Sequence, residues 1–484
     1  MSLKLVEKEA AGHGSTDRVK KLNIQARSAP LTISLVRARA YTEVYKTTES
    51  LPPILRRAMA TSKALDTTTP YILDGELVVG SESSALRAYQ IHPELESNWI
   101  MMEGGLAAMS TRTVQTIHST PEQIKEFDAE ICPYWADKTI IAKLFASAPG
   151  DLIEKCYGAG FVEGMFMAGI LGTHGNPDWD YIMANGLNGI KKTAQEKLAA
   201  WDIMNAEDLG KNHFYQAVIM EMEAIERFAR TYADYAAKLA DQEKDPQRKV
   251  ELEQISEICS RVPHEAPRSF REAIQAFWFV LCAWHLEGNT GTSLSRFDQY
   301  MYPFYKKDIE AGILTREEAQ EILECLWIKL SALPGIADSV TASFLDGAAL
   351  FLNMQIGGVD TYGNDATNEL SYLIIDALIA GAGVGVARIG QYGPDFAQRC
   401  LLSHADPHRS RLDLIAGEDR NRFGGHGTYD QPHVKAGGLR RLDPRVDRRE
   451  PKSLRDLHSS LPQHCLYFLP EPQGHGSLRP TLRP

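Results

Sequence analysis

Two short segments concentrate side chains that could bind or position a polar group. The segment His174–Asp178 (HGNPD) holds an imidazole and a carboxylate close together, and both groups form strong hydrogen bonds. The segment Asn289–Arg296 (NTGTSLSR) is rich in hydroxyl and amide groups. The first pattern is equally typical of a loop histidine followed by an aspartate that caps a helix. Residue types alone leave a binding role and a structural role open.

A third segment, Gly381–Gly385 (GAGVG), has glycines of the kind that approach phosphates. The dinucleotide fingerprint is G-x-G-x-x-G placed between a strand and a helix. Here the glycine spacing differs, and the residues before the segment have helical periodicity. We expect no dinucleotide site at this position.

The seven cysteines form no C-x-x-C pair, which favours reduced thiols in the cytoplasm over disulfides or structural zinc. Four histidines near the C-terminus also lack metal-ligand spacing, so we expect no bound metal. The cysteines are Cys132, Cys156, Cys259, Cys282, Cys325, Cys400 and Cys465, and the histidines are His404, His408, His426 and His433.

The composition is that of a globular protein, with 44% hydrophobic and 24% charged residues among 484. The formal net charge is −11 and no basic stripe is present, which argues against nucleic acid as a partner. The longest apolar run, Ala273–Leu286, falls short of the roughly 20 residues that a membrane span needs. The first residues contain no apolar core typical of a secretory signal. We expect a cytoplasmic protein without a membrane partner.

The composition changes near the C-terminus. Residues 401–484 contain 12 Arg and 2 Lys, and helical periodicity, which is clear up to Ile379, is lost after it. This change is typical of unstructured or out-of-frame sequence. We predict a flexible N-terminus at 1–30, a folded domain at 31–379, and a tail at 380–484 that is disordered and unrelated to that domain.

Patterns within the domain predict a mainly helical α/β fold. Three capping patterns, at Thr120, Ser269 and Thr315, mark helix starts. Asp74-Gly75 lies between two β-prone runs and predicts a strand pair over 71–80. Residues 352–356 (LNMQI) predict a short buried strand. The predicted helices cover residues 33–45, 54–64, 212–240, 270–286, 316–330 and 367–379 and one more starts at 121.

Four groups of residues follow one another along the chain. They are Arg37–Ala40 with Thr42-Glu43 and Arg56–Ala58; Asp74–Gly80 with Pro93-Glu94; Ser293–Leu330; and Gly357–Asp360 with Gly363–Ala366 and Asn368–Tyr372. As an ordered set, covering residues 18–379 almost continuously, they resemble the glycyl radical enzymes, the pyruvate formate-lyase family. The similarity is greatest to the pyruvate formate-lyase-like and glycerol dehydratase-like branch.

The resemblance implies a fold and a chemistry. Family members have a ten-stranded barrel built from two five-stranded halves, and this chain would supply the N-terminal half. The activity would be formate C-acetyltransferase-like or a radical dehydratase or lyase reaction on a small polar substrate, in anaerobic metabolism. No cofactor would be bound. In intact relatives a separate S-adenosylmethionine iron–sulfur activating enzyme installs a glycyl radical. A homodimer is also compatible with the resemblance.

Two signatures of the family are absent from the sequence. It contains neither Gly-Cys-x-Glu, which carries the catalytic cysteine, nor Arg-Val-x-Gly-Tyr, which carries the radical glycine. We therefore assign no catalytic residue and expect a truncated chain that is inactive as written. The alternative is a non-catalytic scaffold or binding subunit that pairs with a full-length partner.

The resemblance also bears on the two polar segments. His174 and Asp178 match an H-x-x-P-D stretch that lies near the substrate in some dehydratase-type members, so we predict that both bind substrate. The segment Asn289–Arg296 corresponds to a second substrate-facing region. There the chain lacks the Gly-His-Ser of the glycerol-type enzymes and has Ser295 in place of a usual glycine. We expect Arg296 and Asp298 to form a structural ion pair.

Overall fold

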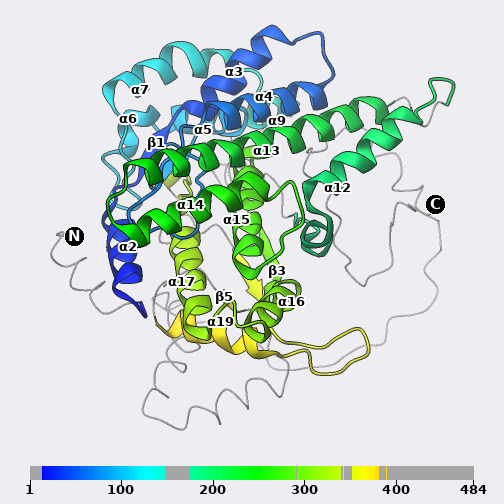
Figure 1. Cartoon of the computed structure of the whole chain (residues 1–484). Coiled ribbons are helices and arrows are strands. Elements are labelled where there is room, and N and C mark those ends of the chain that lie inside the picture. Colours follow the sequence, from blue (N-terminus) through cyan, green and yellow to red (C-terminus); the bar gives the residue numbers. More distant parts are fainter. Residues whose placement is uncertain are drawn as a thin grey trace, which may run out of the picture. The chain divides into compact units, whose positions relative to one another are not determined.

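The computed structural model describes residues 14–147, 175–205, 208, 210–289, 292–339, 342, 352–380 and 388–389. All of them belong to the same one of the two compact units into which the chain divides. The helices (Figure 1) are α2 (Asp17–Ser28), α3 (Val36–Thr47), α4 (Pro53–Thr67), α5 (Pro93–Met102), α6 (Gly105–Met109), α7 (Pro121–Glu126), α8 (Cys132–Trp135), α9 (Ile140–Ser147), α12 (Trp179–Ala199), α13 (Lys211–Gln242), α14 (Pro246–Arg261), α15 (Phe270–Glu287), α16 (Phe297–Glu310), α17 (Arg316–Ala332) and α19 (Glu369–Ile379), with a π-helical turn η1 at Phe127–Ile131.

The described strands are short and parallel. Strand β1 (Thr32–Ser34) pairs with β2 (Ala88–Gln90). Strand β4 (Asn353–Gln355) pairs with β3 (Ser293–Arg296) on one side and with β5 (Arg388–Ile389) on the other. Parallel strands need long crossover connections, which helices supply here. The predicted mainly helical α/β class and the strand within 352–356 are confirmed.

Helix α13 is the longest described element, and it packs against α4, α12, α14 and α15 (Figure 1). Its sequence repeats apolar residues every three or four positions, and that stripe, including Val218, Ile225 and Tyr232, is buried. The predicted helix over 212–240 is confirmed. Helix α15 lies deeper, because every one of its residues except Arg271 is buried.

The helix starts predicted from capping patterns are confirmed. Thr120 and Thr315 each form a capping box with the residue three positions later. The Ser269 hydroxyl accepts a hydrogen bond from the backbone N–H of Glu272, as predicted, at 3.2 Å. The Glu272 carboxylate instead accepts from the backbone N–H of Arg268, at 2.6 Å, so the second half of this box is shifted by one residue.

The predicted strand pair over 71–80 is wrong. The turn exists, since the backbone N–H of Glu76 donates to the carbonyl of Leu73 at 3.1 Å and Gly75 has φ +79°. No strand forms on either side of it. Side chains from distant helices bond to these peptides instead, as Arg248 does when it donates to the carbonyls of Leu73 and Glu76. These bonds replace a strand partner.

Two boundaries also differ from the predictions. The segment expected to be helical from residue 33 begins as β1, because residues 32–34 pair with β2, and α3 starts only at Val36. Within the N-terminus expected to be flexible, residues 17–28 form α2. That helix buries Val19, Leu22 and Ala26, and Thr16 caps it. The segment Gly381–Gly385 and the histidine-bearing tail lie outside the described residues.

Candidate functional site

Of the two predicted substrate-binding residues, Asp178 is described and His174 lies outside the described residues. Asp178 is the N-cap of α12, and one of its carboxylate oxygens accepts a hydrogen bond from the backbone N–H of Tyr181 at 3.0 Å. Partial burial raises the pKa of Asp178, although this bond opposes the rise. No described residue donates to the second oxygen. Asp178 is therefore a helix cap with one oxygen still able to accept a hydrogen bond.

Trp179, which the sequence analysis did not single out, connects this helix start to the second polar segment. The Trp179 ring packs on Phe277 of α15, with ring centroids 4.6 Å apart, and stacks on Tyr300 of α16 at 6.0 Å. The Tyr300 hydroxyl donates to the carbonyl of Leu294 in β3 at 2.8 Å. The structure thus places the start of α12 close to strand β3. An apolar residue directly after an N-cap was the only sequence signal for this contact.

Strand β3 ends in an unusual backbone conformation. Ser295 has φ +52°, a left-handed conformation that favours glycine. Glycine, which the resemblance led us to expect at this position, would adopt this conformation without strain. The following Arg296 donates to the carbonyl of Gly357 at 2.8 Å, and the backbone N–H of Gly357 donates to Asp298 at 2.6 Å.

Arg296 and Asp298 therefore bond to the two backbone groups of one residue, Gly357, and they do not form the direct ion pair that was predicted. Through these bonds the two side chains connect β3 to the turn that follows β4. Burial raises the pKa of Asp298. The hydroxyl of Ser371, in α19, also donates to this carboxylate, which joins a third element to the turn.

The connection from α15 into β3 is tightly bonded. Gly288 has φ +118° and ends the helix, and Asn289 follows it. The Asn289 side chain donates to the Glu287 carboxylate at 2.7 Å, and the Thr292 hydroxyl donates to the carbonyl of Asn289 at 3.1 Å. Asn289 and Thr292 are fully buried. Thr290 and Gly291 lie outside the described residues.

The buried Arg37 and the mostly buried Arg57 cap the C-terminus of α15. The Arg37 guanidinium donates to the carbonyl of Leu286 at 2.6 Å, and Arg57 donates to both the carbonyl and the carboxylate of Glu287. Cations at a helix C-terminus are favourable, because the free carbonyls carry partial negative charge. Arg37 also forms a bidentate pair with Glu94. Burial alone would raise the pKa of Glu94, but Arg37 lowers it to about 2.

Arg37 and Arg57 are among the residues that carry the resemblance, which implied no role for either of them. A partial signal was available, since the residues one helical turn away are apolar, namely Ala40 for Arg37 and Ile54 and Ala60 for Arg57. A guanidinium placed on such a face requires buried acceptors.

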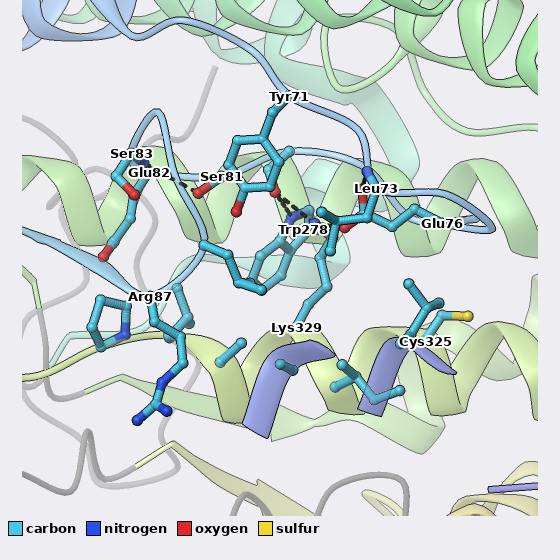
Figure 2. Close-up of a pocket in the computed structure, with 18 residues that line it drawn as sticks. Tyr71, Leu73, Glu76, Ser81, Glu82, Ser83, Arg87, Trp278, Cys325 and Lys329 are labelled. Atoms are coloured by element: carbon cyan, nitrogen blue, oxygen red, sulfur yellow. Dashed lines mark hydrogen bonds and ion pairs between the residues drawn. The ribbon is translucent and has the colours of Figure 1, made fainter. Parts of the chain in front are cut away.

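A small cavity of about 40 Å³ lies between the 71–87 segment and helices α15 and α17 (Figure 2). Tyr71, Glu76, Glu82, Trp278 and Lys329 are among its lining residues. A cavity needs roughly 10–15 Å³ per water molecule, so this one has room for a few waters but not for an organic substrate. Its central ion pair, between Lys329 and Glu76, is structural, because the Lys329 ammonium also donates to the carbonyl of Gly80 at 2.9 Å.

Within the described ranges, no three histidine, cysteine or acidic side chains are grouped so that they could hold a metal ion. No helix in the described part of the chain is long and apolar enough to cross a bilayer. Four described cysteines, Cys132, Cys259, Cys282 and Cys325, are free thiols.

Comparison with known proteins gives a consistent result. Residues 14–380 match the family model described as pyruvate formate lyase-like. Isethionate sulfite-lyase from Oleidesulfovibrio alaskensis is 33% identical over 385 residues, which cover 77% of this chain and 46% of the relative. Trans-4-hydroxy-L-proline dehydratase from Clostridioides difficile is 31% identical over 374 residues, covering 75% and 46% respectively.

Solved structures agree. The Roseburia inulinivorans structure described for 1,2-propanediol dehydration superposes with a TM-score of 0.71 at 31% identity, covering 76% of this chain and 46% of that one. The glycerol-bound, B12-independent glycerol dehydratase from Clostridium butyricum gives 0.69 at 32% identity, with the same coverage. The chain spans about half the length of the relatives it matches. With three quarters of its residues in the match, the chain belongs to the pyruvate formate lyase-like family of glycyl radical enzymes.

Proposed function

We propose that this chain forms the N-terminal, substrate-side part of a radical dehydratase or lyase that acts on a small polar substrate. The observation that carries the proposal is the similarity, at about one third identity, to enzymes named as a sulfite-lyase and as dehydratases. This similarity favours a lyase or dehydratase reaction over formate C-acetyltransferase chemistry, which the sequence analysis left open. Isethionate, diols and hydroxyproline, named for those relatives, define the class of substrate to test.

In this proposal Asp178 and His174 bind the substrate. The second carboxylate oxygen of Asp178 accepts a hydrogen bond from a substrate hydroxyl, while the first oxygen keeps α12 capped. The connection through Asn289 and Thr292 forms a neighbouring wall, held in place by Arg57 and Glu287. The absence of a Gly-His-Ser sequence in that connection argues against glycerol as the substrate.

We assign no radical-carrying residue to the sequence, because it contains neither the Gly-Cys-x-Glu nor the Arg-Val-x-Gly-Tyr signature. The chain by itself is proposed to be inactive and, from its cysteine pattern, cytoplasmic. Intact relatives would be activated by a separate iron–sulfur enzyme. Anaerobic incubation with such an activating enzyme is expected to give no glycyl doublet in the electron paramagnetic resonance spectrum. A doublet would contradict the proposed inactivity.

Calorimetric titration of the chain with isethionate, 1,2-propanediol and trans-4-hydroxy-L-proline tests the substrate side. We expect one of these compounds to bind, and Asp178→Asn to weaken that binding at least about tenfold, since a charged acceptor is lost. Asparagine also caps helices well, so the variant should fold. Asp180→Asn, an exposed change in the same helical turn, is the matched control. Failure of all three compounds to bind would contradict the proposed role, and unchanged binding by the Asp178 variant would remove Asp178 from the site.

A further inference from the structure

A row of three polar side chains is buried next to the C-terminal end of α15. Tyr89 of β2, His92 before α5 and Glu96 within α5 are each less than 5% exposed. The Tyr89 hydroxyl oxygen lies 2.6 Å from a Glu96 carboxylate oxygen and 3.1 Å from Nδ1 of His92. Nε2 of His92 lies 3.4 Å from the backbone carbonyl oxygen of His285. The backbone N–H of His92 donates to the other Glu96 oxygen at 2.7 Å. We call these three side chains the buried triad.

The available hydrogens do not satisfy the buried triad if Glu96 is ionised and His92 is neutral. The carbonyl of His285 can only accept, so a hydrogen bond across its 3.4 Å contact with His92 requires a hydrogen on Nε2. Nδ1 then has a bare lone pair and needs the Tyr89 hydroxyl as its donor. That hydroxyl has a single hydrogen, so it cannot also donate to Glu96. An ionised carboxylate would then face the lone pairs of the Tyr89 oxygen at 2.6 Å.

One additional proton resolves this conflict. If the proton is on Glu96, the carboxyl O–H donates to the Tyr89 oxygen and the Tyr89 O–H donates to His92. If it is on His92, both ring nitrogens donate and the Tyr89 hydroxyl donates to Glu96. Every polar atom of the triad has a complementary partner in either arrangement.

We propose that Tyr89, His92 and Glu96 form a buried proton-binding site that retains one proton through neutral pH. The ligand is the proton itself. The Tyr89 hydroxyl donates to His92 when the proton is on Glu96, and it donates to Glu96 when the proton is on His92. This site is separate from the proposed substrate residues and does not depend on the proposed function.

Charged groups on the surrounding elements favour the Glu96 position. The charges of Arg37 of α3 and Arg57 of α4 disfavour a positive charge on the His92 ring, while Glu94 of α5 favours it. The charge of Glu82, in the segment before β2, contributes to the raised pKa of Tyr89. His285 of α15 contributes its backbone carbonyl, and burial lowers the pKa of its own ring to about 4.

The direction of the pKa shifts supports the same position. Burial raises the pKa of Glu96 to about 8, although the bonds from Tyr89 and from the His92 backbone and the charge of Arg37 oppose this. Burial and the Arg37 charge lower the pKa of His92 to about 3.

The consequence for folding follows from linkage. An unfolded glutamate loses its proton near pH 4.5 and an unfolded histidine near 6.5. Between about pH 4.5 and 6.5 the folded chain holds the proton on Glu96 and the unfolded chain holds one on His92. The two pKa shifts therefore cancel, and the triad's contribution to stability does not change with pH in this range. From about 6.5 to 8 the folded chain holds a proton that the unfolded chain has released, so the triad's contribution to stability falls as pH rises through this window and is constant above it.

Glu96→Gln tests the proposal, because a glutamine amide reproduces the protonated carboxyl. It donates to the Tyr89 oxygen and accepts from the His92 N–H. At about pH 7.5, unfolding of this variant is expected to release one proton fewer per molecule than unfolding of the wild-type chain. The exposed Glu130→Gln is the matched control and should behave as wild type. Equal proton release from the wild type and Glu96→Gln would overturn the proposal.

Infrared spectroscopy of the wild-type chain gives a test that does not require the variant to fold. A protonated carboxyl C=O band is expected at neutral pH and should be lost above about pH 8. Glu82 is a second buried carboxyl whose pKa burial raises to about 8, so the band should be reduced in Glu82→Gln but not abolished. Absence of the band from the wild type, or its complete loss in Glu82→Gln, would overturn the assignment to Glu96.

Discussion

The side-chain amide of Gln275 bonds to both backbone groups of Val79. Its oxygen accepts from the Val79 N–H at 2.9 Å and its nitrogen donates to the Val79 carbonyl at 2.6 Å. An amide in this position reproduces the pair of bonds that a neighbouring strand would make. Both residues are buried, so the 71–87 segment depends on one side chain of α15 for these two contacts.

Replacement of Gln275 by Leu should therefore be costly. Two buried backbone groups would lose their partners, and each unsatisfied group costs about 1–3 kcal/mol, so we expect a loss of about 2–6 kcal/mol. Urea unfolding measures the free energy of unfolding directly. The control is Gln25→Leu at an exposed position of α2, which should change stability by less than about 0.5 kcal/mol. Equal effects of the two changes would contradict the strand-like role of Gln275.

The Arg57–Glu287 pair should behave as a buried ion pair. The Glu287 side chain is fully buried and Arg57 is 12% exposed. Arg57→Met would remove a charge that compensates Glu287, with an expected loss of about 3–5 kcal/mol. The comparison is Arg39→Met, which breaks the surface pair with Glu126 and should cost at most about 1 kcal/mol. If both changes had equally small effects on urea unfolding, the capping role of Arg57 would be wrong.

Ser295→Gly is expected to stabilise the chain. The left-handed backbone of Ser295 costs a residue with a Cβ atom about 1–2 kcal/mol, and glycine removes this cost while losing more freedom on folding. The net gain should be up to about 1 kcal/mol in thermal or urea unfolding. Ser331→Gly, inside α17, should do the opposite and lose about 0.5–1 kcal/mol. A destabilised Ser295→Gly variant would contradict the view that the left-handed backbone at Ser295 is strained.

The pairing of Glu94 with Arg37 predicts a loss of stability in acid. Because the folded pKa of Glu94 is lowered to about 2, its stabilising contribution is fully present above pH 4.5 and is lost as pH falls through about 2. Glu94→Gln should remove about 3 kcal/mol of that dependence, because one pKa unit corresponds to about 1.4 kcal/mol. Unfolding free energies measured from pH 5 downwards provide the check. An acid dependence identical to that of wild type would show that Glu94 does not contribute.

The family could be identified from the sequence because the resemblance depends on the order of residue groups along the chain. The residue groups from Arg37 to Tyr372 occur in a fixed order, and that order survives without knowledge of any contact. The cap of Asp178 could also be foreseen, since an N-cap bond joins residues three positions apart. The end of the folded domain at residue 379 and the nature of the tail remain predictions.

Local hydrogen bonds and periodicity are thus what the sequence by itself determined here. The capping boxes at Thr120 and Thr315 and the buried stripe of α13 involve residues within one or two helical turns. A short stretch of sequence therefore contains all the residues needed to predict them. Only the tertiary structure decided that 71–80 would not pair as strands. Gln275 is 196 positions from Val79, and a bond across that separation leaves no periodic trace in the sequence. The same holds for Arg37, which caps a helix 249 positions away. Buried peptide groups must find a partner somewhere, and packing selects which distant side chain supplies it.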